Sequence, residues 1–166
     1  MRALALVPFI VQAIVIILDE YVFHIKRGLP KWERIGHPLD TLSVLACLAF
    51  VLLMPYEASL IKYYVMVAIF SCLLVTKDEF VHKHHCPAAE HWLHAILFVN
   101  HSILLLAMGL MWPKIHGQKV FEWLPSSEIL IPFLWIQAAF AGLFFLYQMI
   151  YWNFVYTPLQ SHETDQ

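Results

Sequence analysis

The chain has 166 residues, of which 61% are hydrophobic and only 13% are charged, whereas soluble domains are roughly 45–50% apolar and 25% charged. This composition excludes an ordinary water-soluble fold, and the length suits a single domain. The formal net charge is −2 and no basic run is present, so the sequence offers no electrostatic footprint for nucleic acid.

Five apolar stretches nearly fill the chain, and each is close to the roughly 20 residues that cross a bilayer as a helix. In chain order they cover residues 3–24, 38–55, 60–83, 91–112 and 129–154. Most prolines lie between these stretches, at their ends or in a first helical turn, where proline is tolerated. We therefore predict an all-α fold, an integral membrane bundle of about five transmembrane helices that forms one domain over residues 1–166.

Basic residues are divided unevenly between the two ends of the predicted helices. Six lie on the side that holds the first and third loops, and four lie on the other side. The positive-inside rule therefore favours a cytoplasmic location for the first side, with the amino terminus outside. No small-residue cleavage site follows the first apolar run, so we interpret that run as a retained helix rather than a signal peptide.

Histidines and acids are concentrated in one layer. Eight of the ten histidines lie at or near the predicted cytoplasmic ends of the first four helices, together with seven of the twelve acids. A carboxylate costs about 3 kcal/mol at the centre of a membrane helix and less towards the interface, so several in one layer require neutralising partners. Bound metal ions would supply the opposite charge.

Acid and histidine pairs recur in this layer at helical spacing. Glu20 and His24 are four residues apart, as are Glu90 and His94, so each pair projects from one helix face. Glu79-x-x-His82 has the spacing found in carboxylate-bridged metal sites of four-helix bundles. The preferred metal ligands are Glu20, His24, His37, Asp40, Asp78, Glu79, His82, Glu90, His94 and His101. The less favoured candidates are Asp19, Glu33, His84, His85 and His91.

An internal repeat supports two half-sites. Asp19-Glu20-Tyr21-Val22 recurs as Asp78-Glu79-Phe80-Val81, and Glu33-x-x-x-His37 recurs as Glu90-x-x-x-His94. We interpret residues 1–56 and 57–113 as two helical hairpins, followed by a fifth helix within 127–157. Paired about an axis along the membrane normal, the hairpins would bring both half-sites to a common centre. The repeat therefore predicts two metal ions.

The fifth helix has no counterpart in the repeat. Gln148, Trp152 and Tyr156 follow one another at intervals of four residues, close in depth to the predicted metal layer. They would form either a hydrogen-bonding wall beside the metals or ordinary aromatic anchors at the membrane interface.

The ligand types narrow the choice of metal. Imidazole and carboxylate ligands without a convincing thiolate suit iron, manganese or zinc. A carboxylate-rich pattern with paired histidines inside a helical bundle favours iron. We expect two metal ions, with iron preferred and zinc or manganese as alternatives.

The clustered histidines, which include His82-Lys83-His84-His85 and His91-x-x-His94, resemble the histidine boxes of membrane-bound non-haem di-iron enzymes, the fatty acid desaturase and hydroxylase class. The resemblance is at the level of the class and covers roughly residues 19–101. It implies a di-iron oxidoreductase that acts on a lipid or another apolar substrate.

We therefore expect an integral membrane di-metal oxidoreductase whose partners are membrane lipid and, because no nicotinamide or flavin fingerprint is present, an external electron donor. Two other functions stay open. A zinc-dependent membrane hydrolase of lipid amides or esters would use a metal-bound water and an acid such as Glu79 or Glu90 as general base. A metal transporter or sensor, which could act as an oligomer, would need a polar path across the bilayer, and the outer halves of the first four helices offer little of one.

Overall fold

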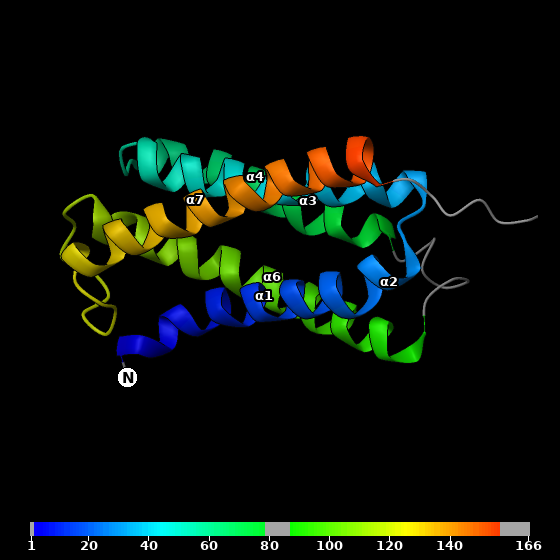
Figure 1. Ribbon diagram of the computed structural model, residues 1–166. Coiled ribbons are helices and arrows are strands. Elements are labelled where there is room, and N and C mark those ends of the chain that lie inside the picture. Colours follow the sequence, from blue (N-terminus) through cyan, green and yellow to red (C-terminus); the bar gives the residue numbers. More distant parts are fainter. Residues whose placement is uncertain (1, 79–86, 157–166) are drawn as a thin grey trace, which may run out of the picture.

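The computed structural model describes residues 2–78 and 87–156, and these residues contain helices and loops but no strand (Figure 1). Within the described ranges, five helices are long and apolar enough to cross a membrane. They are Ala3–Arg27, Lys31–Leu53, Ala58–Lys77, Ala88–Ile115 and Ser127–Val155. The predicted all-α class and the number of long apolar helices are confirmed.

Each long helix is built from one or more labelled elements. The first contains a 3₁₀ turn (Arg2–Leu6), α1 (Val7–Asp19), a π-helical turn (Glu20–His24) and α2 (Ile25–Arg27). The others are α3 (Lys31–Leu53), α4 (Ala58–Leu74) with a 3₁₀ turn (Val75–Asp78), α6 (Ala88–Ile115), and α7 (Ser127–Ile150) with a second π-helical turn (Tyr151–Val155). Helix α3 follows a tight turn at Gly28, whose φ of 77° lies in the left-handed region that favours glycine.

Helix α3 begins seven residues earlier than predicted, at Lys31 instead of residue 38, and Pro38 lies inside it. Proline has no N–H, so the carbonyl of Arg34 lacks its usual helical donor. The side-chain amide of Asn153 contacts that carbonyl at 3.5 Å. Because the helix continues through Pro38, Glu33 and His37 are placed on a regular helix rather than in a loop.

The helices form two layers (Figure 1). Helix α1 packs chiefly along α6, and α3 packs along α7 and α4. The first predicted hairpin is therefore divided between the layers, since α1 has its main partner in α6 and not in α3. The relation of the two hairpins by a repeat axis stays a prediction.

A tightly packed core joins the two layers at the end of the molecule where α3 ends and α4 begins. The Trp112 ring packs edge-on against Phe50 and Tyr56, and its Nε1 donates to the carbonyl of Met54 at 2.8 Å. The Tyr64 hydroxyl donates to the Leu105 carbonyl at 2.6 Å. Aromatic burial at this end holds α3, α4 and α6 together and leaves the opposite end to the polar residues.

Large apolar side chains cover the outward faces of the helices. Leu73, Leu106, Phe140 and Leu143 are each more than 60% exposed. Continuous exposed apolar surface of this kind is unfavourable in water and suits contact with hydrocarbon. The described helices are thus compatible with a membrane protein.

Candidate metal centre

The polar end of the molecule is built around the π-helical turn that follows α1. Its hydrogen bond runs from the Ile25 N–H to the Glu20 carbonyl, five residues back, which brings side chains at positions i and i+5 to the same side. Asp19 and Glu20 therefore both reach His24: Asp19 Oδ2 is 3.3 Å from Nε2, and Glu20 Oε2 is 3.0 Å from Nδ1. One imidazole lies between two carboxylates.

Helix α6 brings Glu90 and His94 against this turn. His94 Nε2 lies 3.1 Å from Asp19 Oδ2, and Glu90 Oε1 lies 3.8 Å from His24 Nε2. Ligand atoms of Asp19, His24, Glu90 and His94 all lie within 4.8 Å of one another, and the four residues are buried. These four residues are called the central group below. Two imidazoles and two carboxylates are a donor set that suits iron, manganese or zinc.

Helix α3 adds a second group that shares His24. Ligand atoms of His24, Glu33 and His37 also lie within 4.8 Å of one another, and the rings of His24 and His37 have centroids 4.8 Å apart. This second group, in which His37 is half-buried, could also hold a metal ion.

Arg27 places a positive charge between the two groups. Its Nη2 donates to Glu90 Oε1 at 2.7 Å and to Glu33 Oε2 at 3.1 Å, and both glutamates are completely buried. A guanidinium keeps its charge when buried, so it neutralises one carboxylate permanently. Of four buried acids in this layer, Glu33 and Glu90 contact Arg27, whereas Asp19 and Glu20 contact His24.

Helix α7 and its final turn fix the orientation of Glu20. The Tyr147 hydroxyl and Trp152 Nε1 donate to Glu20 Oε1 at 2.7 and 2.9 Å, while Oε2 faces His24 Nδ1. With Nδ1 hydrogen-bonded to a carboxylate, Nε2 is the nitrogen that a metal would use. The structure thus places Glu20 behind His24, in the position of a carboxylate that orients a ligating histidine.

Several atoms of the central group have no hydrogen-bond partner among the described residues. They are Asp19 Oδ1, Glu90 Oε2 and His24 Nε2, which has only charge contacts, at 3.3 Å with Asp19 Oδ2 and at 3.8 Å with Glu90 Oε1. A buried polar atom without a partner costs about 1–3 kcal/mol, and more if it is charged. Three such atoms in one group, all of types that ligate metals, suit a bound cation that would accept their lone pairs.

Two other predicted ligands contact different partners. Both oxygens of Asp40 accept from Lys77 Nζ, at 2.6 and 2.7 Å. His101 Nε2 lies 2.9 Å from Ser71 Oγ, which is 2.6 Å from Ser43 Oγ. In the described part of the chain, neither Asp40 nor His101 belongs to a metal-compatible group.

The remaining predicted metal ligands either lie outside the described residues or belong to neither group. Glu79, His82, His84 and His85 lie outside the described residues, as does the side chain of Asp78. His91 is half-buried on α6 and lies in neither group. Of the preferred ligands, the structure brings together His24, His37, Glu90 and His94, with Glu20 directly behind His24. It adds Asp19 and Glu33, which sequence spacing favours less.

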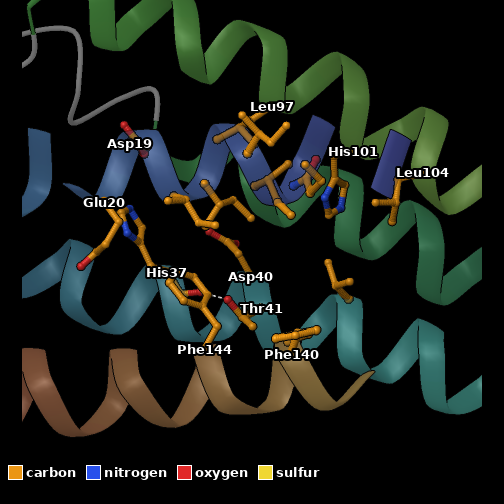
Figure 2. A pocket seen from close by; sticks show the side chains of 18 of the residues that line it. Asp19, Glu20, His37, Asp40, Thr41, Leu97, His101, Leu104, Phe140 and Phe144 are labelled. Carbon is orange, nitrogen blue, oxygen red and sulfur yellow. Dashed lines mark hydrogen bonds between the residues drawn. The ribbon is translucent and has the colours of Figure 1, made fainter. Parts of the chain in front are cut away.

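A cavity of about 600 Å³ adjoins the central group between the two helix layers. Figure 2 shows Asp19, Glu20 and His37 at one end and His101, Leu104 and Phe140 towards the other. Apolar side chains of α1, α6 and α7 form most of its wall. Cavities of this size and polarity are typical of small-molecule sites.

Comparisons of the chain with protein-family models, with curated protein sequences and with solved structures found no significant match.

Proposed function

We propose that the protein is an integral membrane metalloprotein that binds a divalent transition metal ion at the central group. The observation that carries this proposal is the convergence of two histidines and two carboxylates in a buried place, with ligand atoms within 4.8 Å of one another. Buried carboxylates in a low-dielectric interior are destabilising unless positive charge balances them, and a bound metal ion would contribute such charge. The unsatisfied oxygens of Asp19 and Glu90 support the same conclusion.

The proposed topology places the amino terminus outside and the metal layer near the cytoplasmic side. The excess of lysine and arginine around the first and third loops supports this orientation. In that arrangement the aromatic core around Trp112 lies towards the outer side of the bilayer.

Iron is the metal we propose, with two ions per chain. Because His24 Nε2 would bind the ion of the central group, Glu33 and His37 would be the ligands offered to a second ion beside it, and histidine with carboxylate in a helical bundle is the donor set of di-iron sites. When bound, the iron would supply redox chemistry with dioxygen. The chain's own side chains would ligate the iron and exclude water. Hydrogen bonds from Tyr147 and Trp152 fix Glu20 behind His24.

The activity we propose is that of an oxidoreductase acting on a lipid or another apolar substrate, with electrons from an external donor. The support is the cavity, which begins at Asp19, Glu20, His24 and His94 and continues between apolar side chains. A substrate bound there would present its polar end to the metal and its apolar part to the wall. Binding energy from the apolar part would position the reacting end.

Metal analysis of the purified protein tests the proposal. We expect about two iron atoms per chain, and a strong loss of metal in a His94→Ala variant because one of two imidazole ligands is removed. His91→Ala is the matched control, since His91 is on the same helix but in neither group; it should keep the metal. Wild-type metal content in His94→Ala would contradict the assignment, and stoichiometric zinc would point to the hydrolase instead.

A further inference from the structure

The cavity has a second polar region, away from the central group. Gln12 of α1, His101 of α6 and Gln137 of α7 line it, and these three residues are called the distal group below. Gln12 precedes Asp19 by seven residues on α1, and His101 follows His94 by the same interval on α6. At about 1.5 Å per residue, each interval is about 10 Å. Figure 2 shows His101 well apart from Asp19 along the cavity.

One aromatic contact sets the depth of the two glutamines. The Phe9 ring of α1 meets the Phe133 ring of α7 edge-on, with centroids 5.2 Å apart. Both helices run from this contact towards the central group, where the end of α7 donates a hydrogen bond to the turn after α1. Gln12 follows Phe9 by three residues, and Gln137 follows Phe133 by four. The two amides therefore lie at nearly the same depth.

A hydrogen bond sets the depth of His101. Asn100 Nδ2 donates to Gln12 Oε1 and to the Pro8 carbonyl, both at 2.8 Å. His101 is the next residue on α6, and its Nε2 lies 2.9 Å from Ser71 Oγ. Three helices therefore present polar side chains to the cavity at one level.

The distal group has unused hydrogen-bonding capacity. A glutamine amide offers two donors and an acceptor oxygen. Among the described residues, Gln12 has only its bond from Asn100, and Gln137 has no side-chain hydrogen bond. Polar side chains inside membrane helices are costly, and they usually face protein partners or a cavity through which substrates pass. Because both glutamines line the cavity, a ligand can supply the missing partners.

The other polar residues of the cavity wall already have protein partners. Both oxygens of Asp40 accept from Lys77 Nζ, at 2.6 and 2.7 Å. The Thr41 hydroxyl donates to Gln148 Oε1 at 2.7 Å. These residues belong to α3 and to the last turn of α7, whereas the distal group lies on α1, α6 and the first half of α7.

Apolar side chains separate the distal group from the central group. They include Ile16 on α1, Leu97 on α6 and Phe144 on α7. Three bonds of an extended chain span about 3.3–3.6 Å, so roughly nine bonds cover the separation of about 10 Å. Beyond the distal group, Phe9 and Leu104 line a short apolar end. A cavity of about 600 Å³ suits one chain of this kind.

We propose that the cavity binds a single-chain amphiphile with two polar groups about 10 Å apart. The reacting group lies at the central group, and a hydroxyl or carbonyl farther along the chain hydrogen-bonds to the glutamine amides of the distal group. The inference rests on the proposed function and deepens it by naming the substrate class. The distal group fixes how far the chain enters and therefore which carbon reaches the metal.

The test compares two isomers, dodecane-1,8-diol and dodecane-1,2-diol, whose second hydroxyl lies either far from the first or beside it. Equilibrium dialysis of the radiolabelled diols uses the full chain in phosphatidylcholine nanodiscs, with binding to empty nanodiscs subtracted. A Gln137→Leu variant should lower the affinity for the 1,8-isomer about tenfold, because a buried hydroxyl loses its partner. The affinity for the 1,2-isomer should change by less than about twofold, since neither of its hydroxyls reaches the distal group.

Two further variants guard the comparison. Gln12→Leu should also weaken binding of the 1,8-isomer selectively, and Gln118→Leu is the matched control, since Gln118 is exposed and does not line the cavity. All three variants should keep the metal content of the wild type. The proposal is overturned if the wild type binds neither diol, if both cavity variants bind the 1,8-isomer normally, or if both isomers weaken equally.

The outcome is separable from that of the proposed function. A purified protein without metal would contradict the metal centre, but the two glutamines do not belong to the central group. The selective effect of Gln137→Leu on the 1,8-isomer should therefore persist after the metal has been removed with a chelator. Loss of that selectivity would show that the distal group does not bind the second hydroxyl.

Discussion

His24 is the residue on which the site depends most. It belongs to both metal-compatible groups and contacts Asp19 through Nε2 and Glu20 through Nδ1. Spacing alone pairs Glu20 with His24 and predicts both as direct ligands. The hydrogen bonds that Tyr147 and Trp152 donate to Glu20 are contacts between residues more than 120 positions apart, and no local pattern predicts them.

A Glu20→Gln variant distinguishes an orienting carboxylate from a ligand. An amide keeps the shape but removes the charge that holds His24, so we expect metal affinity to fall by roughly 10- to 100-fold, the usual effect of losing an outer partner of a ligating histidine. Tyr147→Phe removes a single hydrogen bond to the same carboxylate and should lower affinity less. Competition with a chelator measures both affinities, and complete loss of metal in Glu20→Gln would show direct ligation.

Arg27 illustrates what sequence reasoning missed. As one of the basic residues around the first loop, Arg27 contributes to the predicted orientation, but its guanidinium lies between the buried carboxylates of Glu33 and Glu90. The available signal was its position three residues after His24, on the same face of a helix.

An Arg27→Met variant should destabilise the metal-free protein strongly. Removing one partner of a buried ion pair costs about 3–5 kcal/mol because the other charge stays buried. The cost for Arg27→Met should lie at the lower end of this range, because the Arg27 side chain is partly exposed. Lys26→Met is the control on an exposed neighbour. Thermal unfolding in detergent should show a clearly lower midpoint for Arg27→Met only, and the difference should shrink when metal is added. Equal midpoints for the two variants would contradict the role given to Arg27.

At the scale of elements, the π-helical turn explains why sequence spacing ranks Asp19 among the less favoured metal ligands although the structure places it in the central group. Five-residue separation puts Asp19 and His24 on different faces of an α-helix, whereas the wider turn brings them together at 3.3 Å. The same turn leads directly to Gly28, whose N–H donates to the His24 carbonyl at 2.8 Å. Apolar periodicity predicts the helix but not this local change of pitch.

A Gly28→Ala variant tests how closely the turn controls the site. Its φ of 77° disfavours any residue with a Cβ, and an added Cβ would collide with the Tyr156 hydroxyl. We expect a loss of about 1 kcal/mol or more in unfolding free energy and weaker metal binding, because the turn positions His24. Gly117→Ala shares the positive φ but meets no atoms within 4 Å, so it should show the strain without the loss of metal. Wild-type metal affinity in Gly28→Ala would show that the turn does not position the site.

At the scale of the whole molecule, the number and approximate bounds of the long apolar helices follow from composition and proline positions, because a helix of about 20 apolar residues is a local property. The packing partners of these helices do not follow from composition or proline positions. The packing of α1 on α6 and of α3 on α7 depends on side-chain fit between distant segments. The cavity exists because those two pairs leave space between them, so no sequence pattern predicted it.

The most direct test of the central claim is X-ray absorption spectroscopy at the edge of the metal that copurifies with the full chain. Two histidines and two carboxylates predict a nearest shell of nitrogen and oxygen at about 2.0–2.2 Å, together with the outer-shell scattering of two imidazole rings per ion at the central group. A sulfur shell at about 2.3 Å, or a purified protein without a metal edge, would contradict the claim that Asp19, His24, Glu90 and His94 bind a metal ion.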